Sequence, residues 1–281
     1  LKAIAQSLEK KIKSELLKMQ KDKPEDYDKF WAAFGRQIKY GAYVQYGAHK
    51  ELLQDLLMYH SSTENKLVSL KDYVSRMKED QKYIYYACGE TVDKIKMLPV
   101  METLSDKGYE VLCMDDSIDE FCTKMIAKYD DKEFKSILDA DLGLESEEER
   151  EEIKKQSEDN KELLDALSKA LEGKVKKVEL TGRLKNHPCC LRAEGPVTLE
   201  MEKVLNQQAA VNGGETVRAD RVLELNADHP IFKKLCALQA EGSDALADYA
   251  DILYTQSLLI EGLPVDDPAG YANKICALLA R

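Results

Sequence analysis

The stretch SDALADYADILYTQSLLIE, from Ser243 to Glu261, carries more apolar surface than a helix on the surface of one domain can use. If the stretch is helical, spacings of four, three and four place one polar line along it: Asp244, Asp248, Asp251 and Thr255. Apolar side chains flank that line on both sides: Leu246, Tyr249, Ile252, Leu253, Leu258, Leu259 and Ile260. Because a single neighbour cannot cover both flanks, we expect this helix to pack in more than one direction.

A second helix is expected after a defined break. Gly262 can adopt the left-handed conformation past a helix end, and Pro264 cannot continue a helix. Asp267 then caps a new helix, and Pro268 fits its first position. Surplus apolar surface on two short antiparallel helices favours a bundle that a second copy completes in two-fold symmetry. A pair buried in its own domain is the alternative. The candidate dimer-interface residues are Leu246, Tyr249, Ile252, Leu253, Leu259, Ile260, Tyr271, Ile275, Leu278 and Leu279.

Length and charge exclude several classes of protein. A chain of 281 residues, 44% of them hydrophobic, is long and apolar enough to form hydrophobic cores, and its length predicts two domains. The formal net charge of −11 repels a phosphate backbone, so we expect no nucleic-acid partner. No apolar run reaches the roughly 20 residues that span a bilayer, so we expect no membrane partner either. The first residue is Leu1 instead of methionine, which is typical of an excised fragment or a processed chain.

The fold class that we expect is α+β, with a boundary between residues 138 and 139. Residues 1–66 form a helical segment, with helices over 1–21, 25–45 and 50–59. Residues 67–138 form a small α/β/α subdomain with strands over 81–88 and 109–114, helices over 91–107 and 117–129, and a final edge strand over 134–138. The order strand, helix, strand, helix predicts a parallel layer, and Ser69 to Val74 is expected to be a connection.

The second half, residues 139–281, is expected to be a mixed α+β dimerisation domain that ends in the helical pair. Ser146 and Glu149 form a capping box for a helix that extends to about Leu171. Strands over 175–180 and 189–193 are expected to pair around a turn at 182–188, and a third strand covers 221–225.

The sequence contains no catalytic or metal-binding constellation. The four histidines are isolated, and the seven cysteines show no C-x-x-C spacing, so we expect no metal site. There is no Walker loop, dinucleotide fingerprint or G-x-S-x-G motif. A nucleophilic Cys88 beside Gly89 is the nearest enzyme hypothesis, but no base is positioned for it. We therefore expect neither an enzyme nor a bound cofactor.

Residues 196–208 are amphipathic. Val197, Met201, Val204 and Leu205 recur on one face of a helix, and the other positions are mostly polar. The pattern alone favours a face that packs on the neighbouring strands. The alternative is an exposed apolar surface for a protein partner, for which the flexible methionine is suited.

Several blocks together resemble the Hsp90 family of molecular chaperones in its bacterial form. The most specific is Ser69 to Thr91, SLKDYVSRMKEDQKYIYYACGET. Further blocks follow the family's order: YDKFWAAFGRQIKYG (27–41), YEVLCMDDSIDEF (109–121), RLKNHPCCL (183–191), LELNADHPIFKKL (223–235) and LLIEGLPVDD (258–267). The resemblance covers nearly the whole chain. It implies the end of the middle domain followed by the carboxy-terminal dimerisation domain.

The same resemblance implies partners and excludes a nucleotide site. The family's ATP-binding domain and the loop that reaches the nucleotide lie upstream, so ATP and magnesium would belong to the longer parent. The implied partners are a second copy and non-native client proteins, whose contacts map to the amphipathic face defined above and to a second patch: Glu120, Phe121 and Lys124. Phe121 retains the family's aromatic character, whereas Lys124 departs from it in charge. A purely structural dimerisation and spacer module is the alternative. Because the acidic tail of eukaryotic members is absent, we expect a bacterial cytoplasmic source, with an organelle as second choice.

Overall fold

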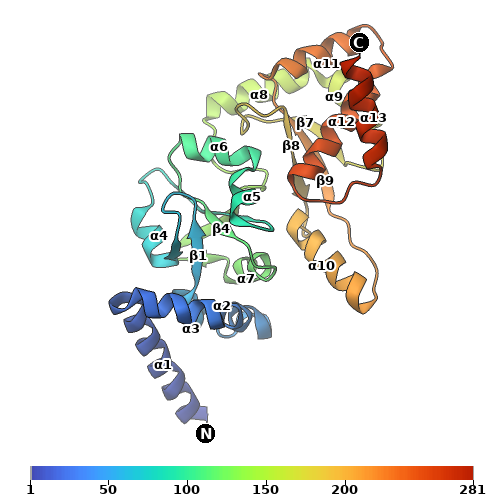
Figure 1. The fold of residues 1–281 in the computed structure, drawn as a ribbon. Coiled ribbons are helices and arrows are strands. Elements are labelled where there is room, and N and C mark those ends of the chain that lie inside the picture. Colours follow the sequence, from blue (N-terminus) through green and yellow to red (C-terminus); the bar gives the residue numbers. More distant parts are fainter. Residues whose placement is uncertain (1, 281) are drawn as a thin grey trace. The chain divides into compact units, whose positions relative to one another are not determined.

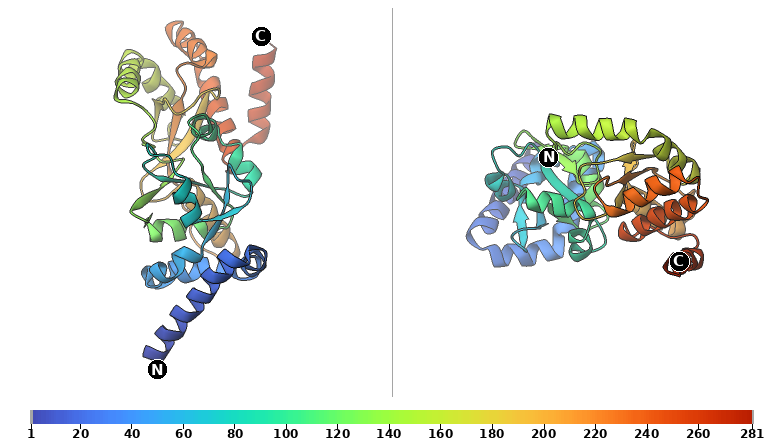
Figure 2. Two further views of the ribbon diagram at one scale, coloured as in Figure 1. Left: turned by 90° about the vertical axis from the view of Figure 1, so that its left-hand side faces the viewer. Right: turned by 90° about the horizontal axis from the view of Figure 1, so that it is seen from above.

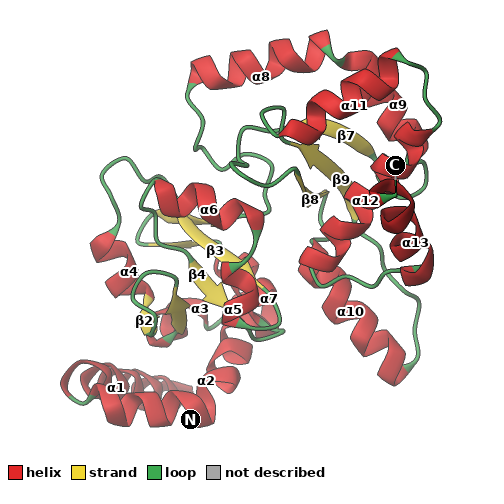
Figure 3. Ribbon diagram, turned by 45° about the horizontal axis from the view of Figure 1, so that its top comes forward, coloured by secondary structure: helices red, strands yellow, loops and turns green. Residues whose placement is uncertain are grey.

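The computed structural model describes residues 2–280, and the side chains of residues 4–280. The chain folds into two compact units (Figure 1). Unit 1 extends to Lys96 and includes Gly108–Ser136, and unit 2 comprises Met97–Lys107 and the chain from Ile137 on. Both units combine helices with a sheet (Figure 3), so the predicted α+β class is confirmed.

Unit 1 begins with four helical elements: α1 (Lys2–Asp22), α2 (Pro24–Gly47), α3 (Lys50–Leu53) and the 3-10 turn η1 (Gln54–Leu56). The first two were predicted. The prediction of a helix over 50–59 was wrong at its end, because Met58 and Tyr59 already belong to a strand, β1 (Met58–Ser61). A short apolar run such as Leu56 to Tyr59 is compatible with either structure, so periodicity cannot decide between them.

The sheet of unit 1 has six strands in the order β2-β1-β4-β3-β6-β5. The elements after β1 are β2 (Leu67–Ser69), α4 (Leu70–Arg76), β3 (Ile84–Cys88), α5 (Val92–Lys96), β4 (Leu112–Met114), α7 (Asp119–Ile126), β5 (Lys128–Tyr129) and β6 (Lys132–Ser136). Strand β3 is parallel to β4, as predicted, and also to β6, whereas β1 runs antiparallel to β4. The strand expected over 134–138 was wrongly placed at the edge of the sheet, because β5 pairs with the outer side of β6. The connection expected at Ser69 to Val74 is instead α4, which Ser69 caps by accepting a hydrogen bond from Asp72 N (3.1 Å).

The core of unit 1 includes a buried ion pair. Tyr27, Trp31 and residues of β1, β3, β4 and α7 form the apolar part. Lys39 Nζ lies 2.7 Å from Asp119 Oδ1, and both side chains are buried. Burial raises the pKa of Asp119 to about 6, although Lys39 acts in the opposite direction. The pair therefore joins α2 to α7, although burying the two charged groups costs them their hydration.

Unit 2 contains α6 (Pro99–Asp106), α8 (Glu147–Asp159), α9 (Lys161–Ala170), β7 (Lys177–Leu180), β8 (Cys189–Glu194), α10 (Leu199–Asn212), β9 (Asp220–Leu225), α11 (Pro230–Ala240), α12 (Ala245–Ile260) and α13 (Pro268–Leu279). The capping box of Ser146 and Glu149 is present at the start of α8. Helix α6 is attached through Thr103, whose Oγ1 donates to Arg183 O (2.8 Å).

The three-stranded sheet of unit 2 has the order β7-β9-β8. The prediction that the first two strands pair around a turn was therefore wrong. Strand β9 lies between them, parallel to β7 and antiparallel to β8. A pairing of such high sequence separation has no local signal, because the hydrophobic pattern of a strand does not identify its neighbours.

Charged side chains are buried beside this sheet. Glu224 on β9 accepts hydrogen bonds from Arg183 Nε (2.5 Å) and from Arg192 Nε (2.8 Å), and all three residues are buried. The Arg183 guanidinium also donates to Ile137 O (3.1 Å) and Asp139 O (2.7 Å). The network thus holds the segment that enters unit 2 against the sheet.

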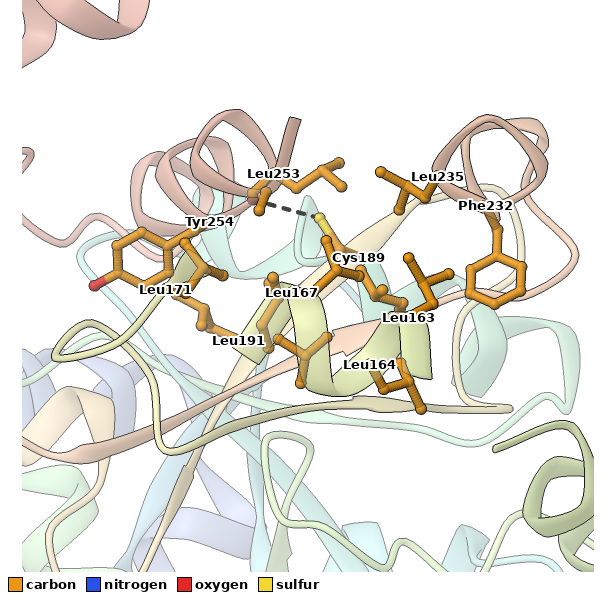
Figure 4. Close-up of a cluster of buried hydrophobic side chains, with 14 of the residues drawn as sticks. Leu163, Leu164, Leu167, Leu171, Cys189, Leu191, Phe232, Leu235, Leu253 and Tyr254 are labelled. Carbon is orange, nitrogen blue, oxygen red and sulfur yellow. Dashed lines mark hydrogen bonds between the residues drawn. The ribbon is translucent and has the colours of Figure 1, made fainter. Parts of the chain in front are cut away.

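The apolar core of unit 2 lies between the sheet and α9, α11 and α12 (Figure 4). Leu163 and Leu167 come from α9, Leu235 from α11 and Leu253 from α12. Cys189 lies among them, with its Sγ 3.5 Å from Leu253 O. Each fully buried side chain of this size contributes about 1.5–3 kcal/mol, so the cluster fixes α12 against the sheet.

Candidate functional site

Helix α10 is attached to the rest of unit 2 largely through polar contacts. Thr198 caps the helix by accepting from Met201 N (3.2 Å), and Leu199 is buried. Glu202 is also buried, where it accepts from Arg221 Nη2 (2.5 Å) and Ala219 N (2.9 Å). One turn later, the Asn206 side chain bonds both backbone groups of Val217. The side of α10 that faces unit 2 is therefore the one formed by Leu199, Glu202 and Asn206.

The predicted apolar face of α10 is only partly covered. Val204 is buried, and Val197 packs against the unit 2 core. Met201 and Leu205 are half-buried. Val211, which the sequence analysis missed because it lies beyond the amphipathic segment, is 84% exposed. Figure 1 shows α10 at the end of unit 2 opposite to α8, α9 and α11.

The predicted interface residues of α12 divide into two groups. Leu246 and Leu253 are buried in the unit 2 core, and Tyr249 packs against it. Ile252 is half-buried, whereas Leu259 is 54% exposed and Ile260 is 38% exposed. The end of α12 therefore carries apolar surface that unit 2 does not cover. Gly262 follows in the left-handed conformation (φ 68°), as predicted.

Helix α13 has an apolar stripe but no buried residue. Asp267 caps it by accepting from Gly270 N (2.8 Å), as predicted. Lys274 Nζ lies 2.5 Å from Asp251 Oδ2, which joins α13 to α12. Three stripe residues, Tyr271, Ile275 and Leu278, are half-buried, and Leu279 is 81% exposed. Figure 2 shows the helix beside the rest of unit 2, at the carboxyl end of the chain.

A cluster of charged residues joins α10 to the end of α12. Lys203 Nζ donates to Glu261 O (3.1 Å) and lies 2.5 Å from Glu200 Oε2. The Glu261 side chain is buried, and its Oε1 has no hydrogen-bond partner among the described residues. Burial raises the pKa of Glu261 to about 7. This carboxyl group thus titrates near neutral pH at the junction of the two helices.

The second predicted patch, on α7, is only partly accessible. Glu120 is buried, and its carboxylate accepts from Tyr86 Oη (3.4 Å) and Cys88 Sγ (3.3 Å). Phe121 is half-buried against Tyr43, with ring centroids 5.9 Å apart. Lys124 is exposed. Of the three residues, Phe121 and Lys124 can therefore be reached without moving α7.

A strained turn lies beside this patch. Gln45 and Tyr46 both have the left-handed conformation, with φ of 53° and 57°, and end the regular part of α2. The Tyr46 side chain is 97% exposed. A Cβ atom on Gly47 would lie 2.7 Å from Met125 Cγ, so the turn packs closely on the end of α7. Sequence reasoning missed the turn, because no glycine stands where it begins.

The family model for the Hsp90 protein matches residues 1–281. The chain belongs to the Hsp90 family. It is 51% identical over 279 residues to the chaperone protein HtpG of Clostridium acetobutylicum, 49% identical to that of Clostridium botulinum and 46% identical to that of Bacillus subtilis. Each alignment covers 99% of this chain and 44% of the relative. This Hsp90-family chain therefore spans less than half the length of these relatives. The predicted resemblance is confirmed.

Four cysteines of this Hsp90-family chain are buried core residues, namely Cys113, Cys122, Cys189 and Cys190, whereas Cys88 and Cys236 are half-buried and Cys276 is exposed. Cys189 and Cys190 are buried, and burial raises the pKa of both thiols. The Cys88 thiol donates to a carboxylate, which does not favour a thiolate. Over residues 2–280, no three His, Cys, Asp or Glu side chains meet in a way that could hold a metal ion. Nor does this range contain a helix that is long and apolar enough to cross a membrane.

Proposed function

We propose that this chain is the client-binding and dimerisation part of an ATP-dependent Hsp90-type chaperone, which assists non-native proteins in folding. The relatives that carry the name chaperone support this function. A cytoplasmic location in a bacterium is proposed on the same ground. ATP and magnesium would act in the part of the parent that these relatives possess beyond the matched region, and nucleotide-driven closure there would rearrange the surfaces described above.

The observation that supports dimerisation is the surface of α13 and the adjoining end of α12. A helix of 12 residues with an apolar stripe and no buried side chain gains little stability from its own unit. Leu259 and Ile260 extend the same kind of surface onto α12. A second copy related by two-fold symmetry would bury these residues twice and complete a four-helix bundle.

The partly covered face of α10 is the proposed client site. Met201, Leu205 and Val211 offer apolar contact, while the polar contacts of Glu202 and Asn206 hold the helix in place. Dimerisation would present two such faces to one client and raise the effective concentration of weak contacts. On α7, Phe121 and Lys124 would add a second contact.

The client site is tested with the 281-residue chain and a fluorescent, reduced and carboxymethylated protein that cannot fold. Met201→Asp with Leu205→Asp should weaken binding at least tenfold, because each half-buried side chain contributes on the order of 1 kcal/mol. Gln207→Asp with Ala210→Asp adds the same charge on an exposed side of α10 and should change binding little. The dimer mass should be the same in all three proteins. Equal client affinity for the two double variants would reject α10 as the site.

A structural dimerisation and spacer module is the second candidate. It is favoured by the burial of Val204, which shows that part of the predicted client face is packed. In that case the chain alone would be a dimer without measurable affinity for the unfolded protein.

A further inference from the structure

The junction between α10 and α12 contains a buried carboxyl group, one oxygen of which has no hydrogen-bond partner among the described residues. Glu261 is 7% exposed, and its Oε1 makes no hydrogen bond within the described part of the chain. The only cation close to it on α10 is Lys203, which is held by the Glu261 carbonyl oxygen and by the Glu200 carboxylate. An ionised carboxylate at this position would lose its hydration, and no hydrogen bond to Oε1 would compensate for that loss. The protonated form avoids that cost.

We propose that the Glu261 carboxyl group is a proton-controlled catch, which holds α10 against the end of α12 when protonated and loosens it when ionised. This inference rests on the proposed function, because α10 carries the proposed client site. Its consequence is that the mobility of the client-facing helix depends on pH through a group that does not touch the client.

The charges that face Glu261 come from two elements. On α10, Glu200 raises the pKa of Glu261 and Lys203 lowers it; from the segment between β7 and β8, Arg183 also lowers it. Burial has the largest effect and brings the pKa from its ordinary value of 4.5 to about 7. The two cations therefore reduce the effect of burial but do not cancel it.

The direction of the pH effect follows from linkage. In the proposed catch, α10 forms part of the cover over this carboxyl group, so detaching the helix hydrates the group and returns its pKa toward the ordinary value. The attached form then binds the proton more tightly, so attachment is strongest at pH below about 4.5 and weakens as the pH rises to about 7. Above that pH the effect is complete. A pKa difference of this size corresponds to a change of up to about two orders of magnitude in the ratio of detached to attached helix.

Hydrogen exchange of the intact chain measures this ratio. Amides in peptides that cover 199–212 should lose protection as the pH rises from 5 to 8, after correction for the intrinsic exchange rate. Glu261→Gln, which is neutral at every pH, should retain protection at pH 8 and remove the pH dependence. The control is Glu241→Gln, because Glu241 is exposed at the end of α11 and should leave the profile unchanged.

Two further variants separate a proton-controlled catch from a purely structural contact. Glu200→Gln removes a charge that raises the pKa of Glu261, so the midpoint of the profile should move to lower pH. Lys203→Met removes a charge that lowers it, so the midpoint should move to higher pH. A pH-independent profile in the wild type, or variants that reduce protection without moving the midpoint, would overturn the proposal. If the profile behaves as expected but the chain binds no unfolded protein at any pH, the catch stands and the proposed function fails.

Discussion

Replacing Leu259 and Leu279 by aspartate should dissociate the proposed dimer without unfolding the protomer. Both side chains are more than half exposed in the single chain, so the substitutions remove few internal contacts. In the dimer they would lie in the apolar interface, where a carboxylate cannot be accommodated without losing its hydration.

The magnitude follows from the number of side chains that two-fold symmetry buries. Each substitution occurs twice in the dimer, so four leucines are lost. At about 1.5 kcal/mol for each leucine, the dimer loses about 6 kcal/mol, which corresponds to an increase in Kd of about four orders of magnitude. A nanomolar dimer would then be monomeric at micromolar concentration.

Sedimentation equilibrium or light scattering at about 1 micromolar, which is below the Kd of about 10 micromolar that a nanomolar dimer would acquire, measures this change. The matched control is Asn273→Asp with Ala277→Asp, which adds the same charge to exposed positions on the other side of α13. The control should remain a dimer, and thermal unfolding followed by circular dichroism should be similar in both variants. The reasoning is refuted if the wild type is a monomer, or if the leucine variant keeps the mass of the wild type.

Three other changes test the internal structure. Glu224→Gln should lower the free energy of unfolding by about 3–5 kcal/mol in urea, since it leaves the buried Arg183 without a carboxylate and removes one of the carboxylates that pair with Arg192, which keeps Glu179; a loss below about 1 kcal/mol would contradict this. Lys39→Met should destabilise the chain more at pH 8 than at pH 5, because Asp119, with a pKa of about 6 in the wild type, is largely ionised and paired with Lys39 only at the higher pH; equal losses would refute the role of the pair. In thiol titration of the native chain, Cys276 should react first, because it is the exposed cysteine; fast reaction of a buried thiol would show that the core is open.

The parts of the fold that depend on local pattern could be predicted from the sequence. The helices over the first 45 residues, the capping box at Ser146 and the helical pair joined at Gly262 all follow from periodicity and capping chemistry. Each of these signals lies within a few residues of the feature that it determines. The family was recognised for a different reason, because several specific blocks occur in one order.

The errors concern pairing and short elements. The position of β9 between β7 and β8 depends on contacts between residues far apart in the chain. Helix α4 was predicted as a connection, although Ser69 and Asp72 form a capping contact that the sequence contains. The antiparallel hairpin of β1 and β2 was missed, because an apolar run does not specify a strand by itself.

The candidate site was predictable in composition but not in exposure. Periodicity places Val204 on the same face as Met201, yet Val204 is buried. The polar attachment of α10 through Glu202 decides which side of the helix is covered, and that contact requires Arg221 from another element. On α7, Glu120 was taken as accessible, whereas hydrogen bonds from β3 hold it inside unit 1.

The most direct test of the account is a hydrogen-exchange footprint of an unfolded client on the intact chain. With the reduced, carboxymethylated protein bound, peptides that cover 197–212 should gain protection, and those of α8 should not. Protection in α13 should depend on the concentration of the chain and not on the client. A client footprint that leaves 197–212 unchanged would contradict the claim that the partly covered face of α10 binds non-native protein.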